Sequence, residues 1–247
     1  MARTATAKRI VFPRWANYLL PLLVLGGLGG ALYAPLIVGF GFSPKTTAVG
    51  YAPLQPVEYS HALHAGKLGI DCRYCHNTVE QAGYAAVPAT QTCMNCHTNI
   101  NPNEGVKLTK VKESCATGEP IAWVKIHDLP DYAYFNHASH VNKGVSCISC
   151  HGRVDQMEVV YQAQPLSMGW CLDCHREPEH NLRPKDQVTN LGWKVEDLAT
   201  TNPDLYATIQ QKNPGQTINQ DVLGEFLKKE YLIRDSHYMT ACSTCHR

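Results

Sequence analysis

The sequence predicts a mainly α-helical and irregular fold with one transmembrane helix near its N-terminus, and three observations lead to this class. Long segments with helical or strand periodicity are scarce in the 247 residues. Ten of the eleven cysteines fall into five CxxCH sequences. The 25 residues from Tyr18 to Phe42 include no charged side chain. We therefore expect short helices and loops with little sheet.

The uncharged run from Tyr18 to Phe42 is long enough to cross a bilayer as a helix. Basic residues and no acidic ones precede it, namely Arg3, Lys8, Arg9 and Arg14. This charge pattern places the N-terminus in the cytoplasm and the rest of the chain on the outer face of the membrane. A cleaved signal peptide is the alternative, but the apolar run is long for one and no clear A-x-A site follows it. The net charge of +1 gives no sign of nucleic-acid binding.

The CxxCH sequences decide between zinc, disulfides and haem. A CxxC pair alone fits all three, whereas a histidine directly after the second cysteine is the attachment signature of c-type haem. The two thiols add to the porphyrin vinyl groups, and the histidine binds the iron. A zinc site would need two cysteine pairs together, or one pair with histidines at the spacing of a zinc finger. Zinc binding also does not explain why all five pairs are followed directly by histidine.

The sequence thus predicts five covalently bound c-type haems. The expected thioether cysteines are Cys72, Cys75, Cys93, Cys96, Cys147, Cys150, Cys171, Cys174, Cys242 and Cys245. The expected proximal iron ligands are His76, His97, His151, His175 and His246. Cys115 remains, and we expect a buried thiol that behaves as a small apolar residue, with a link to another subunit as the alternative.

Two HxxH pairs supply candidates for the second axial ligand. His61 and His64 precede the first CxxCH, and His137 and His140 precede the third, so that HxxH followed by two CxxCH sequences forms an internal repeat. Residues i and i+3 of a short helix share a face but diverge. One histidine can therefore bind its local haem while the other reaches a neighbouring haem. For His140 we expect that haem to lie in the first module or at the fifth CxxCH.

Two residues are candidates for the remaining axial ligand. His127 lies close to the second module in the sequence, and Met157 is the alternative, because methionine also binds haem iron. His237 and Met239 precede the fifth CxxCH too closely to wrap over the far side of its haem. His180 is expected to meet solvent or a haem propionate.

The predicted organisation follows these signals. The boundaries are a cytoplasmic tail at 1–16, a transmembrane anchor at 17–42, a linker at 43–58 and an outer haem domain at 59–247. Within the haem domain we expect modules at 59–100 and 135–177, a haem-poor segment at 178–236 and the fifth haem at 237–247. A polar loop is expected at 101–120. An amphipathic helix is expected at 219–233, capped by Asn219, with Leu223, Phe226, Leu227 and Tyr231 on one face. The haems themselves should supply much of the core.

The repeated module resembles the class III multihaem cytochromes. With its five CxxCH sequences, one anchor and the segments AVPATQTCMNCHT, FNHASHV, CHGRVDQMEVVYQ and PLSMGWCLDCHR, the chain resembles the pentahaem cytochrome c subunit of alternative complex III. The resemblance covers nearly the whole chain. It implies a short-helix fold wrapped round five haems on the periplasmic face of the bacterial inner membrane.

The resemblance also implies a function and partners. The chain would relay electrons from quinol oxidation, in a respiratory or photosynthetic complex, to a cytochrome c, another soluble carrier or a terminal oxidase. Its partners would be an iron–sulfur subunit, quinol-binding membrane subunits and a monohaem cytochrome c. The alternative is a membrane-anchored quinol dehydrogenase that feeds a periplasmic reductase. A catalytic pentahaem reductase is disfavoured because all five motifs end in histidine, so we assign no catalysis to the chain alone.

Overall fold

The computed structural model describes residues 12–41, 48–100 and 105–247. The chain divides into two compact units, Met1–Ala48 and Val49–Arg247. Most of the predicted cytoplasmic tail, including Arg3, Lys8 and Arg9, lies outside the described residues. The same is true of Phe42, of the first part of the predicted linker and of residues 101–104.

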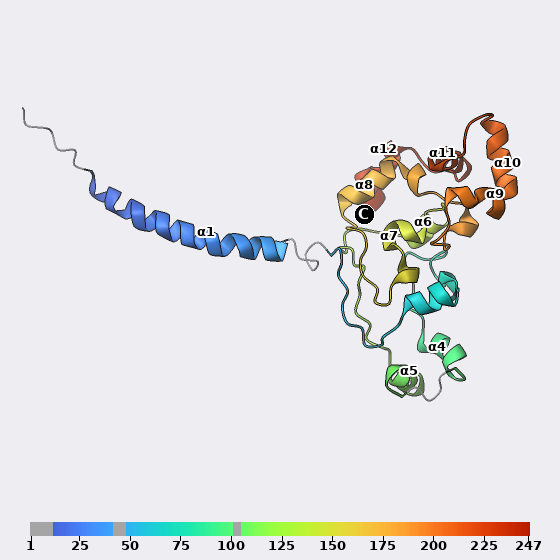
Figure 1. The fold of residues 1–247 in the computed structure, drawn as a ribbon, viewed down its shortest axis with the longest axis horizontal. Coiled ribbons are helices and arrows are strands. Elements are labelled where there is room, and N and C mark those ends of the chain that lie inside the picture. Colours follow the sequence, from blue (N-terminus) through green and yellow to red (C-terminus); the bar gives the residue numbers. More distant parts are fainter. Residues whose placement is uncertain (1–11, 42–47, 101–104) are drawn as a thin grey trace, which may run out of the picture. The chain divides into compact units, whose positions relative to one another are not determined.

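The N-terminal unit consists of η1, Arg14–Tyr18, followed by the long helix α1, Leu19–Gly41 (Figure 1). Within the described residues, one helical stretch, Arg14–Gly41, is long and apolar enough to cross a membrane. Pro21 falls in the first turn of α1, where an amide proton is not needed. Pro35 lies inside the helix, which continues past it. The expected helical anchor is therefore present as a helix of suitable length and composition.

The second unit is made of short helices joined by long irregular segments (Figure 1). In the first half these are η2 Ala62–Lys67, α3 Cys72–Cys75, α4 Thr90–His97, α5 Gly105–Thr117, α6 His137–Val141, α7 Cys147–His151 and η3 Val154–Gln156. In the second half they are α8 Met168–Arg176, η4 Pro178–Asn181, η5 Lys185–Gln187, η6 Val195–Asp197, α9 Leu198–Thr201, α10 Pro203–Lys212, α11 Gln220–Glu230, α12 Ser236–Met239 and α13 Cys242–Cys245. The described residues form no strand, only an isolated bridge between Val145 and Leu182. The predicted fold class is confirmed.

Many of these helices begin at a polar side chain that accepts a hydrogen bond from a backbone amide of the first turn. The capping residues are Asp71 for α3, Asn136 for α6, Ser167 for α8, Asn219 for α11 and Asp235 for α12. A capping oxygen satisfies an amide that has no partner within the helix. Helices this short gain little from propagation, so the caps and tertiary contacts fix where they start.

The polar loop expected at 101–120 is wrong, because Gly105–Thr117 forms the helix α5. Val111 and Ser114 are buried on one face of this helix, and Cys115 is half-buried. The Ser114 hydroxyl lies 2.7 Å from the Thr90 hydroxyl at the start of α4. Packing against α4 thus stabilises a helix whose sequence shows a weak apolar pattern. Figure 1 shows α4 and α5 together at one end of the unit, with α10 and α11 at the other.

The apolar core of the second unit lies in the haem-poor segment. It is formed by Leu182, Trp193, Leu198, Ile209, Leu223 and Leu227, all nearly or fully buried. The predicted amphipathic helix is confirmed as α11, since Leu223 and Leu227 are buried and the side chain of Asn219 accepts from the Val222 amide. A side chain at Gly224 would place its Cβ 2.1 Å from the carbonyl oxygen of Glu179. Glycine there lets α11 pack directly on η4.

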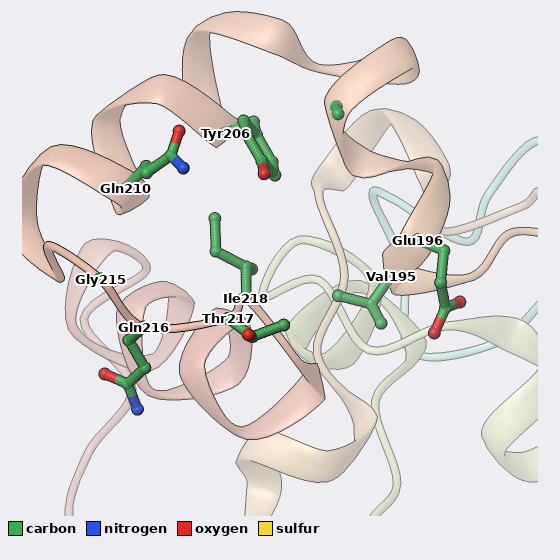
Figure 2. A pocket seen from close by; sticks show the side chains of 9 residues that line it. Val195, Glu196, Tyr206, Gln210, Gly215, Gln216, Thr217 and Ile218 are labelled. Carbon is green, nitrogen blue, oxygen red and sulfur yellow. The ribbon is translucent and has the colours of Figure 1, made fainter.

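A pocket of about 420 Å³ opens on the same segment. Figure 2 shows its walls, with Tyr206 and Gln210 of α10 on one side and Val195 and Glu196 of η6 on another, and Ile218 before α11. No cysteine or histidine lines it. The pocket is therefore separate from the thiol and imidazole groups that form the candidate site.

Candidate functional site

Both cysteines of each CxxCH sequence lie on a short helix, and the histidine is either part of that helix or the residue directly after it. We number the sites in chain order: site 1 is Cys72–His76 on α3, site 2 is Cys93–His97 on α4, site 3 is Cys147–His151 on α7, site 4 is Cys171–His175 on α8 and site 5 is Cys242–His246 on α13. Residues i, i+3 and i+4 of a helix share one face. At sites 2, 3 and 4 the helix therefore places two thiols and one imidazole on one face, and at sites 1 and 5 the histidine directly follows the helix.

The thiols do not form the alternative structures that a CxxC pair allows. All eleven cysteines are free. In the described residues, no three side chains of histidine, cysteine, aspartate or glutamate converge in the way a metal ion would need. Structural zinc is normally held by four such ligands. The described residues therefore contain neither a disulfide nor a cluster of zinc ligands.

Sites 1 and 3 meet through their first cysteines. The thiols of Cys72 and Cys147 are hydrogen-bonded to each other. This bond lowers the pKa of the Cys72 thiol and, together with burial, raises that of Cys147. The two sulfur atoms are ones that would carry haem thioethers. The first sites of the two modules are therefore direct neighbours.

The other sites are also linked by neighbouring thiols. The neighbouring thiols are Cys75 and Cys93 for sites 1 and 2, Cys150 and Cys174 for sites 3 and 4, and Cys171 and Cys245 for sites 4 and 5. Burial raises the pKa of the first-named thiol of each pair, and the nearby charge of its neighbour raises that pKa further. With the contact between sites 1 and 3, these pairs arrange the sites in the spatial order 2–1–3–4–5. This order differs from the order along the chain.

An aromatic ring organises each HxxH pair. It lies two residues before the first histidine, packs edge-on against that imidazole and stacks face to face on the second. The contacts are Tyr59 with His61 at 4.7 Å and with His64 at 4.5 Å, and Phe135 with His137 at 4.7 Å and with His140 at 4.6 Å, all between ring centroids. The sequence repeat is therefore also a structural repeat.

The second histidine of each pair faces the second site of its own module. The ring centroids of His64 and His97 are 6.1 Å apart, and those of His140 and His175 are also 6.1 Å apart. Two imidazoles that bind one metal ion from opposite sides, each at about 2 Å, have centroids roughly 6 Å apart. These separations therefore fit an iron held between the rings. The expectation that His140 reaches the first module or site 5 differs from this placement at site 4.

The first histidine of each pair lies near the first site of its module. The centroids of His137 and His151 are 6.4 Å apart, with the ring planes within 13°. Burial, followed by the nearby charge of His76, lowers the pKa of His61 to about 4. Burial also lowers the pKa of His151 to about 3. His61 and His151 are therefore neutral at physiological pH, which is the form that binds metals.

Backbone carbonyls orient many of the rings. In each of the following pairs the Nδ1 of a histidine lies 2.8–2.9 Å from a carbonyl oxygen: His64 with Ser60, His76 with Ala86, His137 with Gly83, His140 with Asn136, His175 with Met239 and His246 with Tyr132. In the tautomer that donates from Nδ1, the lone pair on Nε2 is free for iron. Such a second hydrogen bond is typical of histidines that bind metals.

Site 3 has a further imidazole beside it. The ring of His127 lies 4.4 Å from that of His151, and its Nε2 is buried without a hydrogen-bond partner. Met157, the other candidate, is buried next to Gly152, which directly follows His151. A buried nitrogen without a partner is uncommon and fits an atom that awaits a ligand. The structure thus brings His127, His137 and Met157 to site 3.

Site 5 has a different surrounding. His246 lies against the ring of Tyr132 at 5.9 Å, and within the described residues no second imidazole is in ring contact with it. His237, on α12, is exposed. His180 is also exposed, with its Nδ1 3.1 Å from the carboxylate of Asp221. Neither histidine is brought to a CxxCH ring.

Tyr59 and Phe135 contact the candidate ligands, although neither the CxxCH nor the HxxH motif includes them. The signal was present, because an aromatic residue stands two positions before the first histidine in both YSHALH and FNHASH. The backbone carbonyls that orient the rings cannot be recognised in the sequence, because every residue type has a carbonyl. His137 illustrates this point, because its Nδ1 donates to Gly83 of the other module.

The sequence was compared with protein families and with known proteins. No family model matches the sequence. A protein of Nitratidesulfovibrio vulgaris (strain Hildenborough), described as "Menaquinone reductase, multiheme cytochrome c subunit", is 26% identical over 178 residues. The match covers 62% of this chain and 84% of that protein. The chain is thus similar to a multihaem cytochrome c subunit.

Proposed function

We propose that this chain is a membrane-anchored c-type cytochrome that carries five covalent haems and relays electrons within a quinone-linked membrane complex. The observation that carries the proposal is the spacing of roughly 6 Å between imidazoles at sites 2, 3 and 4. Bound haem supplies a one-electron carrier, and two axial imidazoles suit it to electron transfer, whereas catalysis needs an open position.

The residues then have distinct roles. The ten CxxCH cysteines anchor the haems, and the histidine that ends each motif is the proximal ligand. The opposite ligands are His61 at site 1, His64 at site 2, His137 at site 3 and His140 at site 4. His127 and Met157 are the alternative ligands at site 3. Backbone carbonyls hold six of these rings, those of His64, His76, His137, His140, His175 and His246, in the tautomer that leaves Nε2 free.

The spatial order 2–1–3–4–5 provides a continuous path through the outer domain. Sites 1 and 3 join the two modules, and sites 2 and 5 are the two ends of the array. Electrons would enter near one end and leave near the other. The helix Arg14–Gly41 would anchor the chain, with the haem domain on the periplasmic side of the membrane.

The specific complex is proposed from the sequence segments that resemble alternative complex III. In that complex the chain would work beside an iron–sulfur subunit, quinol-binding membrane subunits and a monohaem cytochrome c. It would pass electrons from quinol to a cytochrome c or a terminal oxidase. The related protein from N. vulgaris is described as part of a menaquinone reductase, a name that implies electron transfer to the quinone and not from quinol. A second candidate is therefore a relay that carries electrons to the quinone pool.

The haem count is tested first on protein from its native host. Denaturing mass spectrometry of the mature chain should give a mass increased by five haems. The variant Cys242→Ala/Cys245→Ala, which removes the thiols of site 5, should show four. A native chain with four haems or fewer would contradict the proposal.

The direction of transfer is tested on the complex isolated with this chain. We expect quinol to reduce the haems, and the reduced haems to be reoxidised by a cytochrome c acceptor. In the reverse assay, a reduced cytochrome would donate electrons and menaquinone would be reduced. Faster reverse than forward transfer would favour the second candidate. Quinol oxidation by the isolated chain without its partners would instead support a quinol dehydrogenase.

A further inference from the structure

The segment from Leu182 to Asn190 covers the start of site 3. Leu182 forms the isolated bridge with Val145, and the amide of Arg183 donates to the carbonyl of Gly144 at 2.8 Å. Further along, the carbonyl of Val188 accepts from the amide of Cys147 at 3.2 Å. Backbone hydrogen bonds at both ends therefore fix the segment against Gly144, Val145 and the first cysteine of site 3.

The same segment also contacts site 1. The Cys72 thiol points at the carbonyl of Thr189, with 3.9 Å between sulfur and oxygen, and the Thr189 hydroxyl donates to Asp71 at 2.8 Å. Because Cys72 and Cys147 contact each other, the segment spans the junction between the two modules.

Arg183 places a positive charge at this junction. Its Nη1 donates to the carbonyl of Asn190 at 2.9 Å, which closes the segment into a loop, and its guanidinium lies over the ring of Trp193 at 5.4 Å. In the described residues Arg183 makes no ion pair with a carboxylate. The half-buried side chain therefore holds a charge that no acidic side chain neutralises. Burial lowers the pKa of Arg183, and the nearby sulfur of Cys147 opposes that effect.

We propose that the positive charge of Arg183 raises the reduction potential of the haem at site 3. The inference rests on the proposed function, since it assumes a haem at that site. Reduction adds a negative charge to the haem, and a fixed cation nearby favours the reduced form. Arginine keeps its charge even when half-buried. The charge thus keeps the haem at the junction easier to reduce than a neutral side chain would.

The test is a spectroelectrochemical titration of the full-length haem-loaded protein and its variants. In Arg183→Gln, one of the five midpoint potentials should shift to a lower value. Arg183→Met should show the same shift while it keeps an aliphatic side chain on Trp193. This second neutral variant tests the role of the charge if Arg183→Gln loses haem. Arg183→Lys should restore most of the original potential, because the charge is retained.

Lys212→Gln is the matched control. This lysine also lies over an aromatic ring, Phe226 at 4.8 Å, but it belongs to α10 in the haem-poor segment. It should leave all five potentials unchanged. Unchanged potentials in both neutral Arg183 variants with five haems present would overturn this inference alone. An equal shift in Arg183→Lys would also overturn it, since the effect would not come from charge. A chain without covalent haem would overturn the proposed function as well.

Discussion

At the residue scale, Tyr59 and Phe135 explain how one HxxH pair serves two sites. Each aromatic ring stacks on the second imidazole and meets the edge of the first, so the two histidines point in different directions. The Nδ1 of His140 is held by the carbonyl of Asn136, one turn earlier in the chain. That bond directs the ring toward site 4.

The two histidines of the second pair should therefore respond differently to substitution. In His137→Ala the haem at site 3 should lose its second imidazole, and in His140→Ala the haem at site 4 should do so. Each variant should keep five haems, with one converted to a high-spin form visible by electron paramagnetic resonance. The potential of that haem should rise, because loss of an imidazole destabilises the ferric state more than the ferrous state.

His180→Ala is the control for this pair, since His180 is exposed and lies against Asp221. It should leave all haems low-spin. If His137→Ala stays fully low-spin while His127→Ala does not, His127 is the ligand at site 3. Low-spin haems in all three variants His127→Ala, His137→Ala and His140→Ala would contradict the axial roles given to these imidazoles.

At the scale of the element, α11 shows how a single glycine permits close packing. Gly224 sits in the buried face with Leu223 and Leu227, directly against the backbone of η4. Lys228 reinforces the same contact through an ion pair with Glu179 at 2.9 Å. The sequence predicts the apolar face of this helix, but it gives no sign that a backbone lies across it.

Gly224→Ala should destabilise the protein even though alanine favours helices. The added Cβ would lie 2.1 Å from the Glu179 carbonyl oxygen, so α11 must move away from η4. Overpacking of this kind typically costs about 1–3 kcal/mol. Thermal unfolding of the haem-loaded protein should show a lower midpoint.

Gly192→Ala provides the comparison for this change, because its Cβ would meet only the Asn190 side chain, at an ordinary 3.7 Å. Its midpoint should stay near that of the parent protein. Equal midpoints for the Gly224 and Gly192 variants would show that α11 does not press on η4 as described.

At the scale of the whole molecule, the buried apolar side chains and the haem sites occupy different parts of the second unit. The main apolar cluster is drawn from residues 182–227, and the modules contribute few fully buried side chains. Many apolar side chains near the sites, such as Tyr132 and Tyr134, are exposed. The haems would therefore supply much of the core of the modules, and the haem-poor segment has its own core.

The chain expressed without haem maturation should accordingly fail to form stable modules. Binding that exists only in the native state contributes directly to folding free energy. Limited proteolysis of this apoprotein should cut residues 59–177 rapidly, whereas the haem-loaded protein should resist. Mass spectrometry of the fragments measures this, and a heat-denatured sample is the reference for full exposure. An apoprotein whose modules resist the protease would refute the idea.

The sequence by itself determined the chemistry of this protein. Covalent attachment needs thiols and an imidazole within one helical turn, so the CxxCH spacing predicts the attachment residues without any tertiary information. The uncharged run likewise predicts the helix α1, because crossing a bilayer depends on length and composition. The apolar period of α11 predicts its buried face. Each of these properties is local in the chain.

Tertiary structure decided which groups meet. The contact of Cys72 with Cys147, the spatial order of the sites and the placement of His140 at site 4 depend on residues far apart in the sequence. The helix α5 forms where the sequence predicts a loop, because α4 covers its weak apolar face. Arg183 gains its place at the junction through backbone hydrogen bonds, which carry no side-chain signal. Such contacts depend on how the modules fold against each other, and a local pattern cannot encode them.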